Sequence, residues 1–284
     1  MKRYRILNMD FDTRASVLSQ EIDDTWEESV KQLWRENRQR LQQELQAEFG
    51  PHNFSDKLQN FLDLGAAPFS VLAFHNQFLR QARNSFIVGS YYPALTGACA
   101  LGERILNHLI RELRDSYSGT PQYKAVYRKD SFDDWSKAID VLEAWGVFLP
   151  GVAQLYRDLQ QKRNDAIHFR PETDTNAREL ALAALQLLSQ IIDIQFGAFG
   201  DRPWFIENAP GVTFIKREYQ DVPFVEKVLL PNAVLVGPRH ELEWTGSGFQ
   251  PIDEDTDDDD DQTGTDEDFV REWKGVHPDP PPST

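Results

Sequence analysis

The chain has 284 residues, of which 40% are hydrophobic and 12% aromatic, a composition that fits a globular protein and excludes a fully disordered one. Its formal net charge of −16 is unevenly distributed. Residues 253–284 hold 13 acidic against two basic side chains and account for −11, which leaves −5 for residues 1–252. The overall acidity therefore does not exclude an RNA substrate.

The single cysteine, Cys99, cannot form an internal disulfide, and its apolar helical surroundings (LTGACALGERIL) predict a buried small side chain. No charged leader followed by an apolar segment opens the sequence, and no apolar run approaches the roughly 18 residues of a membrane helix. We therefore expect a soluble, cytoplasmic protein with no membrane partner.

Residues 1–66 are expected to form an N-terminal helical extension. MKRYRILNMDF alternates enough for a short strand, and Asp24-x-x-Glu27 resembles a capping box at the start of a long, charged amphipathic helix. Gly50 should end that helix, and a shorter one should cover residues 55–64.

Residues 67–202 are expected to form a compact helical domain. Pro68 suits a first helical position, and a strongly apolar helix is predicted over YYPALTGACALGERILNHLIRELRD. Four small residues on that helix would let another helix approach closely: Gly97, Ala98, Ala100 and Gly102.

Three further helices complete the predicted domain. Ser131-x-x-Asp134 predicts the cap of a helix that ends near Gly146, and Pro150 marks the start of the next one. Residues 176–199 form the most hydrophobic helix expected, which is typical of the centre of a bundle or of an oligomer interface.

The pattern changes after Arg202. VTFIKREYQ, PFVEKVLL and NAVLVG are rich in β-branched residues and predict a small antiparallel sheet within residues 203–252. Residues 253–284, an aspartate run with a proline-rich end, are expected to be a disordered acidic tail. The predicted fold class is mainly α: a helical bundle with an N-terminal helix, a small C-terminal β segment and this tail.

Arg163-Asn164-x-x-x-His168 stands at the end of a predicted helix, just ahead of Pro171, and is the candidate catalytic site. Histidine can transfer protons near neutral pH, and a guanidinium can stabilise the negative charge that develops on a phosphorane. Asparagine can orient the phosphate or the imidazole. Asn164 and His168 share a helix face, whereas Arg163 and His168 are about 140° apart round an ideal helix. Two chains paired about a two-fold axis, or a bend before Pro171, would bring guanidinium and imidazole together.

The helices from about 68 to 200, with this signature before the last of them, resemble a HEPN domain (higher eukaryotes and prokaryotes nucleotide-binding). GACALGERILNHL, with its small residues and Glu103, is similar to the core helix of that family. The resemblance implies a homodimeric, metal-independent ribonuclease with no cofactor, an RNA substrate, and a role in toxin, antiviral or RNA-processing systems. It also allows a protein partner or antitoxin. It implies catalytic roles for Arg163, Asn164 and His168 only.

Other interpretations stay open. Arg163 and His168 could instead be ordinary surface residues, because Lys162, Arg163, Asp165 and Arg170 form a charged patch of the kind that a solvated helix face shows. Asp165 is a candidate supporting residue of the site. Glu103 either supports the site as an acid or forms a hydrogen bond in the core. The chain could also be a non-catalytic dimeric binding or regulatory module whose acidic tail engages a basic partner. That tail either solvates the chain or mimics a nucleic-acid backbone.

The remaining histidines are expected to be structural or exposed. They lack a neighbouring carboxylate or cysteine pattern typical of a metal site, and they include His75, His108, His240 and His277. No metal site is therefore predicted.

Overall fold

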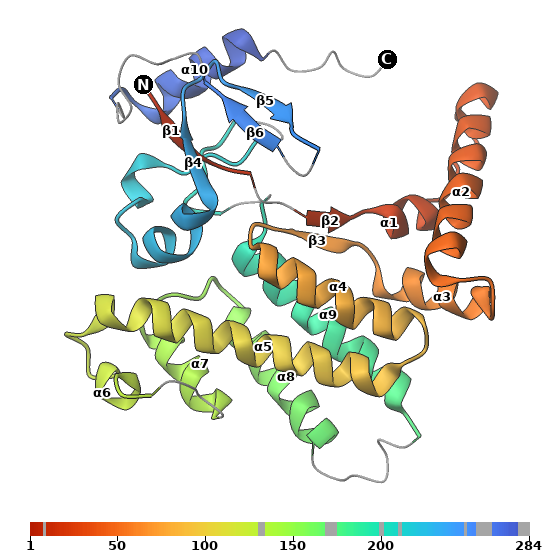
Figure 1. Ribbon diagram of the computed structural model, residues 1–284, viewed down its shortest axis with the longest axis horizontal. Helices are drawn as coiled ribbons and strands as arrows, with labels where there is room; N and C mark the ends of the chain where they lie inside the picture. The colour runs from red at the N-terminus through yellow and green to blue at the C-terminus, as the bar shows by residue number, and fades with distance from the viewer. Residues whose placement is uncertain are drawn as a thin grey trace. The chain divides into compact units, whose positions relative to one another are not determined.

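The computed structural model describes residues 1–7, 10–129, 134–167, 175–198, 202–209, 212–246, 249–253 and 263–277. It is mainly helical with short strands, as predicted (Figure 1). The chain divides into two compact units, each assembled from separated segments. The larger unit contains Asp10–Ile110 and Arg128–Phe196, and the smaller contains Met1–Met9, Arg111–Tyr127 and Gly197–Thr284.

The larger unit is a helical assembly with one pair of short strands. Its helices are α1 (Arg14–Ser19), α2 (Glu28–Phe49), α3 (Phe54–Leu64), α4 (Ala73–Ile87), most of α5 (Tyr91–Leu113), α7 (Trp135–Ala144), α8 (Val152–Ile167) and α9 (Ala177–Phe196). Strands β2 (Asp10–Asp12) and β3 (Ala67–Ser70) pair antiparallel.

Helix α9 lies at the centre of this unit. It packs against α3, α4, α8 and β3, and the Val71 N–H donates to the Phe196 carbonyl at 3.0 Å. Among the described helices, α9 is the one long and apolar enough to cross a membrane by length and composition. Its packing on four elements indicates a core helix, in agreement with its predicted place in the bundle.

The small residues of α5 allow close helix packing, as predicted. A Cβ atom added at Gly97 would lie 3.3 Å from Ala82 Cβ of α4. At Gly102 it would lie 2.8 Å from Leu159 Cδ2 of α8 and 3.0 Å from Trp135 Cη2 of α7. Cys99, on the same helix, is buried as expected.

Two predictions in the N-terminal part are wrong. Helix α2 begins at Glu28 without a side-chain cap, and Asp23, not Asp24, accepts the local hydrogen bonds of the preceding turn. Pro68 lies in β3 and not at a helix start, because residues 67–70 pair with β2, a partner that local sequence does not reveal. The predicted strand near the start is confirmed by β1 (Arg3–Ile6) and β2.

Other predicted helix boundaries agree with the structure more closely. Gly50 ends α2 with a positive φ of 79°, and α3 covers the predicted 55–64. Helix α7 begins three residues later than the Ser131-x-x-Asp134 pattern predicts, because Asp134 is itself the N-cap and accepts a hydrogen bond from the Lys137 N–H; Ser131 lies outside the described residues. Helix α8 begins at Val152, directly after the predicted start signal Pro150-Gly151.

The smaller unit is built around a strand pair and a helix. Strand β4 (Ala233–Val236) pairs antiparallel with β1, and β5 (Glu241–Trp244) pairs with β6 (Phe249–Ile252). Short helical segments complete it: η1 (Arg114–Tyr117), α6 (Tyr123–Val126), η3 (Arg217–Tyr219), η4 (Val225–Leu229), η5 (Leu230–Asn232) and α10 (Asp266–Val276). One cluster of buried side chains in its core consists of Ile206, Ala209, Phe214, Val236, Phe269, Val270 and Trp273.

The predicted three-segment sheet is only partly right. NAVLVG contains β4, but the partner of β4 is the N-terminal strand β1. PFVEKVLL is helical, and its buried residues Phe224, Val225, Val228 and Leu229 recur at the spacing of a helix. β-Branched composition pointed to a strand, whereas the spacing of the apolar residues identifies the helix.

The predicted disorder of the tail is wrong for residues 266–276, which form α10. Thr265 and Asp268 form a capping box at its start, and Phe269, Val270 and Trp273 are buried. The fully buried Arg3 of β1 donates from Nε to Asp266 Oδ1 at 2.6 Å. The apolar face of α10 gives residues 266–276 a core to join. Residues 254–262 and 278–284 lie outside the described residues.

Candidate functional site

The described part of the motif occupies the last turn of α8. Arg163, Asn164 and Asp165 lie on this helix, which ends at Ile167. His168 lies outside the described residues, as does Pro171. The geometry of the site is therefore that of the residues around Arg163.

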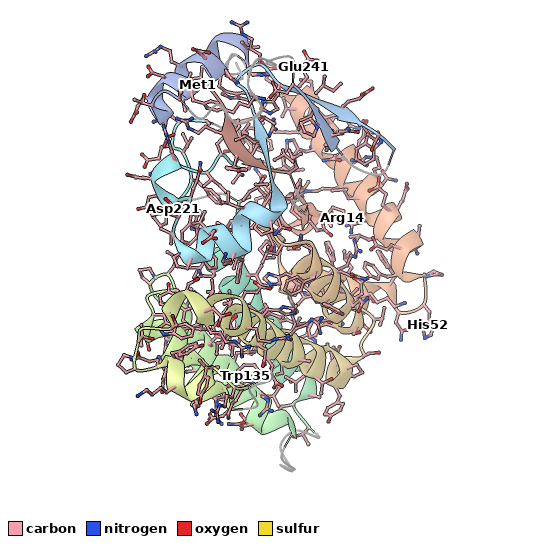
Figure 2. All side chains as sticks on the ribbon, turned by 60° about the vertical axis from the view of Figure 1, so that its left-hand side comes forward. Met1, Arg14, His52, Trp135, Asp221 and Glu241 are labelled. Carbon is pink, nitrogen blue, oxygen red and sulfur yellow. The ribbon has the colours of Figure 1, made fainter. Side chains whose placement is uncertain are left out.

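The side chain of Arg163 contacts residues from two other helices. Its Nη2 atom is 3.3 Å from Glu103 Oε2 on α5. The same carboxylate oxygen accepts a hydrogen bond from Trp135 Nε1 on α7 at 2.9 Å, and Arg163 Cζ lies 5.7 Å from the centre of the Trp135 ring. We call these three residues the Glu103–Trp135–Arg163 cluster; Trp135 is labelled in Figure 2.

The packing of the helices explains why these side chains meet. Gly102 lets Leu159 of α8 and Trp135 of α7 approach the α5 backbone, and Glu103 is the next residue of α5. Arg163 is four residues after Leu159, on the same face of α8, so the contact at Gly102 aligns Arg163 with Glu103. One small residue thus brings three helices to the cluster.

The cluster is only partly shielded from water. The Arg163 side chain is 23% exposed and that of Glu103 is 35% exposed, whereas Trp135 is fully buried. An ion pair at this exposure contributes little to stability, about 0–1 kcal/mol. Its main effect is to orient the guanidinium.

Cys99, one turn before Glu103 on α5, is not a nucleophile at neutral pH. Burial raises the pKa of its thiol to about 12; the charge of Arg163 opposes this rise and the charge of Glu103 adds to it. Only a thiolate reacts as a nucleophile. Cys99 therefore serves the packing of α5.

Asn164 and Asp165 are both partly buried. Asp165 accepts a hydrogen bond from Gln161 Nε2, one turn earlier on α8, at 3.1 Å. The Asn164 side chain makes no hydrogen bond with the residues that the structure describes. The structure thus unites Arg163 with Glu103, while Asp165 bonds along its own helix.

The cluster shows that both interpretations of Glu103 have a structural basis, since it accepts a bond from buried Trp135 and also pairs with Arg163. Sequence reasoning missed Trp135. The residue directly follows Asp134 of the predicted capping pattern, but nothing local relates it to Glu103, 32 residues away. Over the described ranges, no group of three or more His, Cys, Asp or Glu side chains could hold a metal ion.

Comparisons with protein-family models, curated proteins and solved structures gave no match. What the chain does must therefore be inferred from its own residues.

Proposed function

We propose that the chain is a HEPN-like, metal-independent endoribonuclease that acts as a homodimer on single-stranded or loop RNA. The observation that supports this most is the orientation of Arg163 by Glu103 and Trp135, five residues before His168. A cation that is oriented before the reaction needs little reorganisation when charge develops on a phosphate. A toxin or anti-phage role is part of the same proposal and rests on the resemblance of the motif.

The proposed reaction needs no group from outside the protein and RNA. The 2′-oxygen attacks the adjacent phosphorus and loses its proton, the bond from phosphorus to the 5′-oxygen breaks, and the leaving oxygen gains a proton. The products are a 2′,3′-cyclic phosphate and a 5′-hydroxyl end. His168 moves the proton as general acid or base, Arg163 stabilises the phosphorane, and Asn164 orients the phosphate or the imidazole.

The ion pair with Glu103 is compatible with this role for Arg163. A guanidinium has five N–H donors, and Glu103 engages the one nitrogen Nη2. The remaining donors suffice for two parallel hydrogen bonds to a phosphate. Glu103 would then be a positioning residue.

The same ion pair also favours a second candidate, a non-catalytic dimeric module. An arginine whose charge Glu103 already balances needs no substrate, and the cluster then only ties α5, α7 and α8 together. In that function the acidic tail would engage a basic protein partner.

RNA cleavage in the presence of a chelator distinguishes the two candidates. For the enzyme we expect His168→Ala and Arg163→Ala to lose on the order of 10²- to 10³-fold in rate, with folding retained. Arg157→Ala is the matched control, since Arg157 lies on the same helix and pairs with Asp140 and Glu143. Cleavage that is absent, or equal in all four proteins, contradicts the enzyme and supports the module.

A mixing experiment tests whether two chains share each site. If Arg163 of one chain serves His168 of the other, mixed dimers of Arg163→Ala and His168→Ala contain one intact site. Random exchange makes half of the dimers mixed, so about a quarter of wild-type activity should return. Activity should also fall on dilution in step with dimer loss; full activity of a proven monomer would rule out the shared site.

A further inference from the structure

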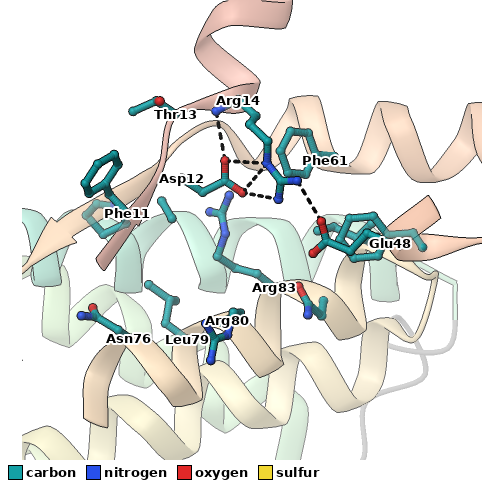
Figure 3. A pocket seen from close by; sticks show the side chains of 15 residues that line it. Phe11, Asp12, Thr13, Arg14, Glu48, Phe61, Asn76, Leu79, Arg80 and Arg83 are labelled. Atoms are coloured by element: carbon teal, nitrogen blue, oxygen red, sulfur yellow. Dashed lines mark hydrogen bonds and ion pairs between the residues drawn. The ribbon is translucent and has the colours of Figure 1, made fainter. Parts of the chain in front are cut away.

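The larger unit contains a cavity of about 460 Å³ that the ribonuclease proposal does not use. Residues of β2, β3, α1, α2, α3 and α4 line it (Figure 3). Its lining includes three arginines, Arg14, Arg80 and Arg83, beside the apolar side chains of Phe11 and Phe61. Arg163 is not among the lining residues.

Arg83 brings a buried positive charge to this cavity. It is 5% exposed, and its Nη2 atom donates to the Gly65 carbonyl at 2.5 Å. Its Nη1 atom is buried and has no hydrogen-bond partner among the described residues. A buried charged donor without an acceptor is costly in free energy. Nη1 is therefore suited to donate a hydrogen bond to an acceptor atom of a ligand.

The charge of Arg83 persists at neutral pH. Burial lowers its pKa to about 10, and the nearby Asp12 carboxylate opposes that change. Figure 3 shows the side chain running from α4 toward Asp12. The guanidinium is therefore protonated, and it is a buried cation among the residues that line the cavity.

Arg14 largely occupies the two carboxylates of the cavity. Its Nε and Nη2 atoms donate to Asp12 at 3.0 and 2.8 Å, and its Nη1 atom donates to Glu48 at 2.8 Å. Burial alone would raise the pKa of Asp12, but the hydrogen bonds and charge of Arg14, with the charge of Arg83, lower it. The lining thus contains three arginines and two carboxylates, and Arg14 is the arginine that binds both carboxylates.

An apolar wall adjoins the charged residues. Phe11 stacks on Phe69 with ring centres 4.0 Å apart and is half exposed. The centre of the Phe61 ring lies 5.5 Å from Arg14 Cζ. The buried Leu79 completes the wall. Small-molecule sites commonly combine an apolar lining of roughly 300–1,000 Å³ with a few placed polar groups.

We propose that this cavity binds a small organic oxyanion: a carboxylate or phosphate monoester attached to an aromatic or aliphatic body. Arg83 Nη1 binds the oxyanion, Arg80 adds positive charge at the exposed side, and the wall of Phe11, Phe61 and Leu79 contacts the body. Both oxyanions offer the planar pair of acceptors that a guanidinium recognises.

Calorimetry with simple probes tests the site in the full chain. Benzoate and phenyl phosphate should bind the wild type, whereas neutral benzamide should not. Whichever of the two anions binds with the higher affinity shows whether the site prefers a carboxylate or a phosphate monoester. Inorganic phosphate should bind more weakly than phenyl phosphate, because it cannot use the wall. Equal binding of benzamide and benzoate would overturn the proposal.

Substitutions locate the binding. Arg83→Met should weaken the better anion on the order of 10- to 100-fold, the effect of losing a charged hydrogen bond. Arg80→Gln, at an exposed position, should weaken it less and supplies the test if Arg83→Met does not fold. Arg178→Gln is the matched control, since it removes a partly buried arginine paired with Asp63 elsewhere in the unit. Undiminished binding in both cavity variants, or no anion binding by the wild type, refutes the site.

Discussion

Gly102 is the residue on which the Glu103–Trp135–Arg163 cluster most directly depends. Gly102→Ala would place a methyl group 2.8 Å from Leu159 Cδ2 and 3.0 Å from Trp135 Cη2. Overpacking of this kind costs about 1–3 kcal/mol, which exceeds the gain of about 1 kcal/mol in helix propensity. We expect the free energy of unfolding, measured by urea denaturation, to fall.

Gly275→Ala is the control for Gly102→Ala. Gly275 also lies in a helix, α10, but a Cβ atom there meets nothing within 4 Å. We expect this variant to gain about 0.5–1 kcal/mol, because alanine is the better helix former. If both variants are more stable than the wild type, the packing of α7 and α8 against Gly102 leaves room for a methyl group, contrary to our expectation.

His75 should make the stability of the larger unit depend on pH. It is buried between the rings of Phe74 and Phe196, whose centres are 4.2 and 4.6 Å away. Burial, and less strongly the charge of His108, lowers the pKa of His75 to about 3, against about 6.5 in an unfolded chain. The unfolded state therefore binds the extra proton first, and stability is lost as the pH falls from 6.5 towards 3.

Urea denaturation at pH 7 and pH 5 measures this effect. The wild type should lose about 2 kcal/mol more than His75→Phe between these two pH values, since each unit below 6.5 costs about 1.4 kcal/mol. His52→Phe, which removes an exposed histidine of the same unit, is the control and should behave like the wild type. An unchanged pH slope in His75→Phe would contradict the assignment.

At the scale of single residues, sequence reasoning reached Arg163 and Glu103 but not their common partner. Arg163 belongs to a spaced motif, and Glu103 stands out as a charge on an apolar helix, so both leave a local signal. Trp135 and Arg83 leave none. Their roles arise from contacts with Glu103 and with the Asp12 region, which sequence spacing does not encode.

At the scale of elements, the helices whose ends carry local signals were predicted well. Gly50 and Asp134 end or begin a helix through their own backbone and side-chain preferences, so short stretches of sequence suffice. Strand β3 and the partner of β4 were not predicted, because a strand depends on a partner distant in sequence. The β-branched composition of PFVEKVLL predicted a strand, but the segment is helical, as the spacing of its apolar residues indicates.

Helix α10 should be essential to the smaller unit. Phe269 is fully buried, and its ring lies 4.8 Å from that of Phe214. Phe269→Ala should cost about 3–5 kcal/mol through lost burial and the resulting cavity. Near-ultraviolet circular dichroism during urea denaturation would report the earlier loss of packing.

Val276→Ala provides the comparison on the same helix. Val276 is 47% exposed, so its truncation should change stability by no more than about 0.5 kcal/mol. Similar small effects at both positions would mean that α10 does not form part of the core.

At the scale of the whole molecule, α10 changes how the acidic tail has to be tested. Deleting residues 253–284 would remove Phe269, Val270 and Trp273 from a core as well as removing charge. The aspartate run should instead be neutralised by Asp→Asn at positions 257–261, which leaves α10 in place.

If the tail mimics a nucleic-acid backbone, this neutralised chain should bind or cleave RNA more strongly at low salt. The difference should shrink as added salt screens the charges. A control with the same change in net charge uses exposed positions in or near α2, changed to Gln: Glu21, Glu27, Glu28, Glu36 and Glu44. If both sets of substitutions have an equal effect, the tail acts only through the net charge of the chain and does not mimic a nucleic-acid backbone.

The pairing of Arg3 with Asp266 has a consequence for the order in which the chain is made. The two residues are 263 positions apart, so at about 5–20 residues per second a ribosome needs tens of seconds to supply the second one. Strand β1 is synthesised before its partners β4 and α10. Most segments of the larger unit are complete before these two partners have been synthesised. During biosynthesis the nascent chain thus carries an unpaired strand edge, and this edge is where a chaperone would have most to protect.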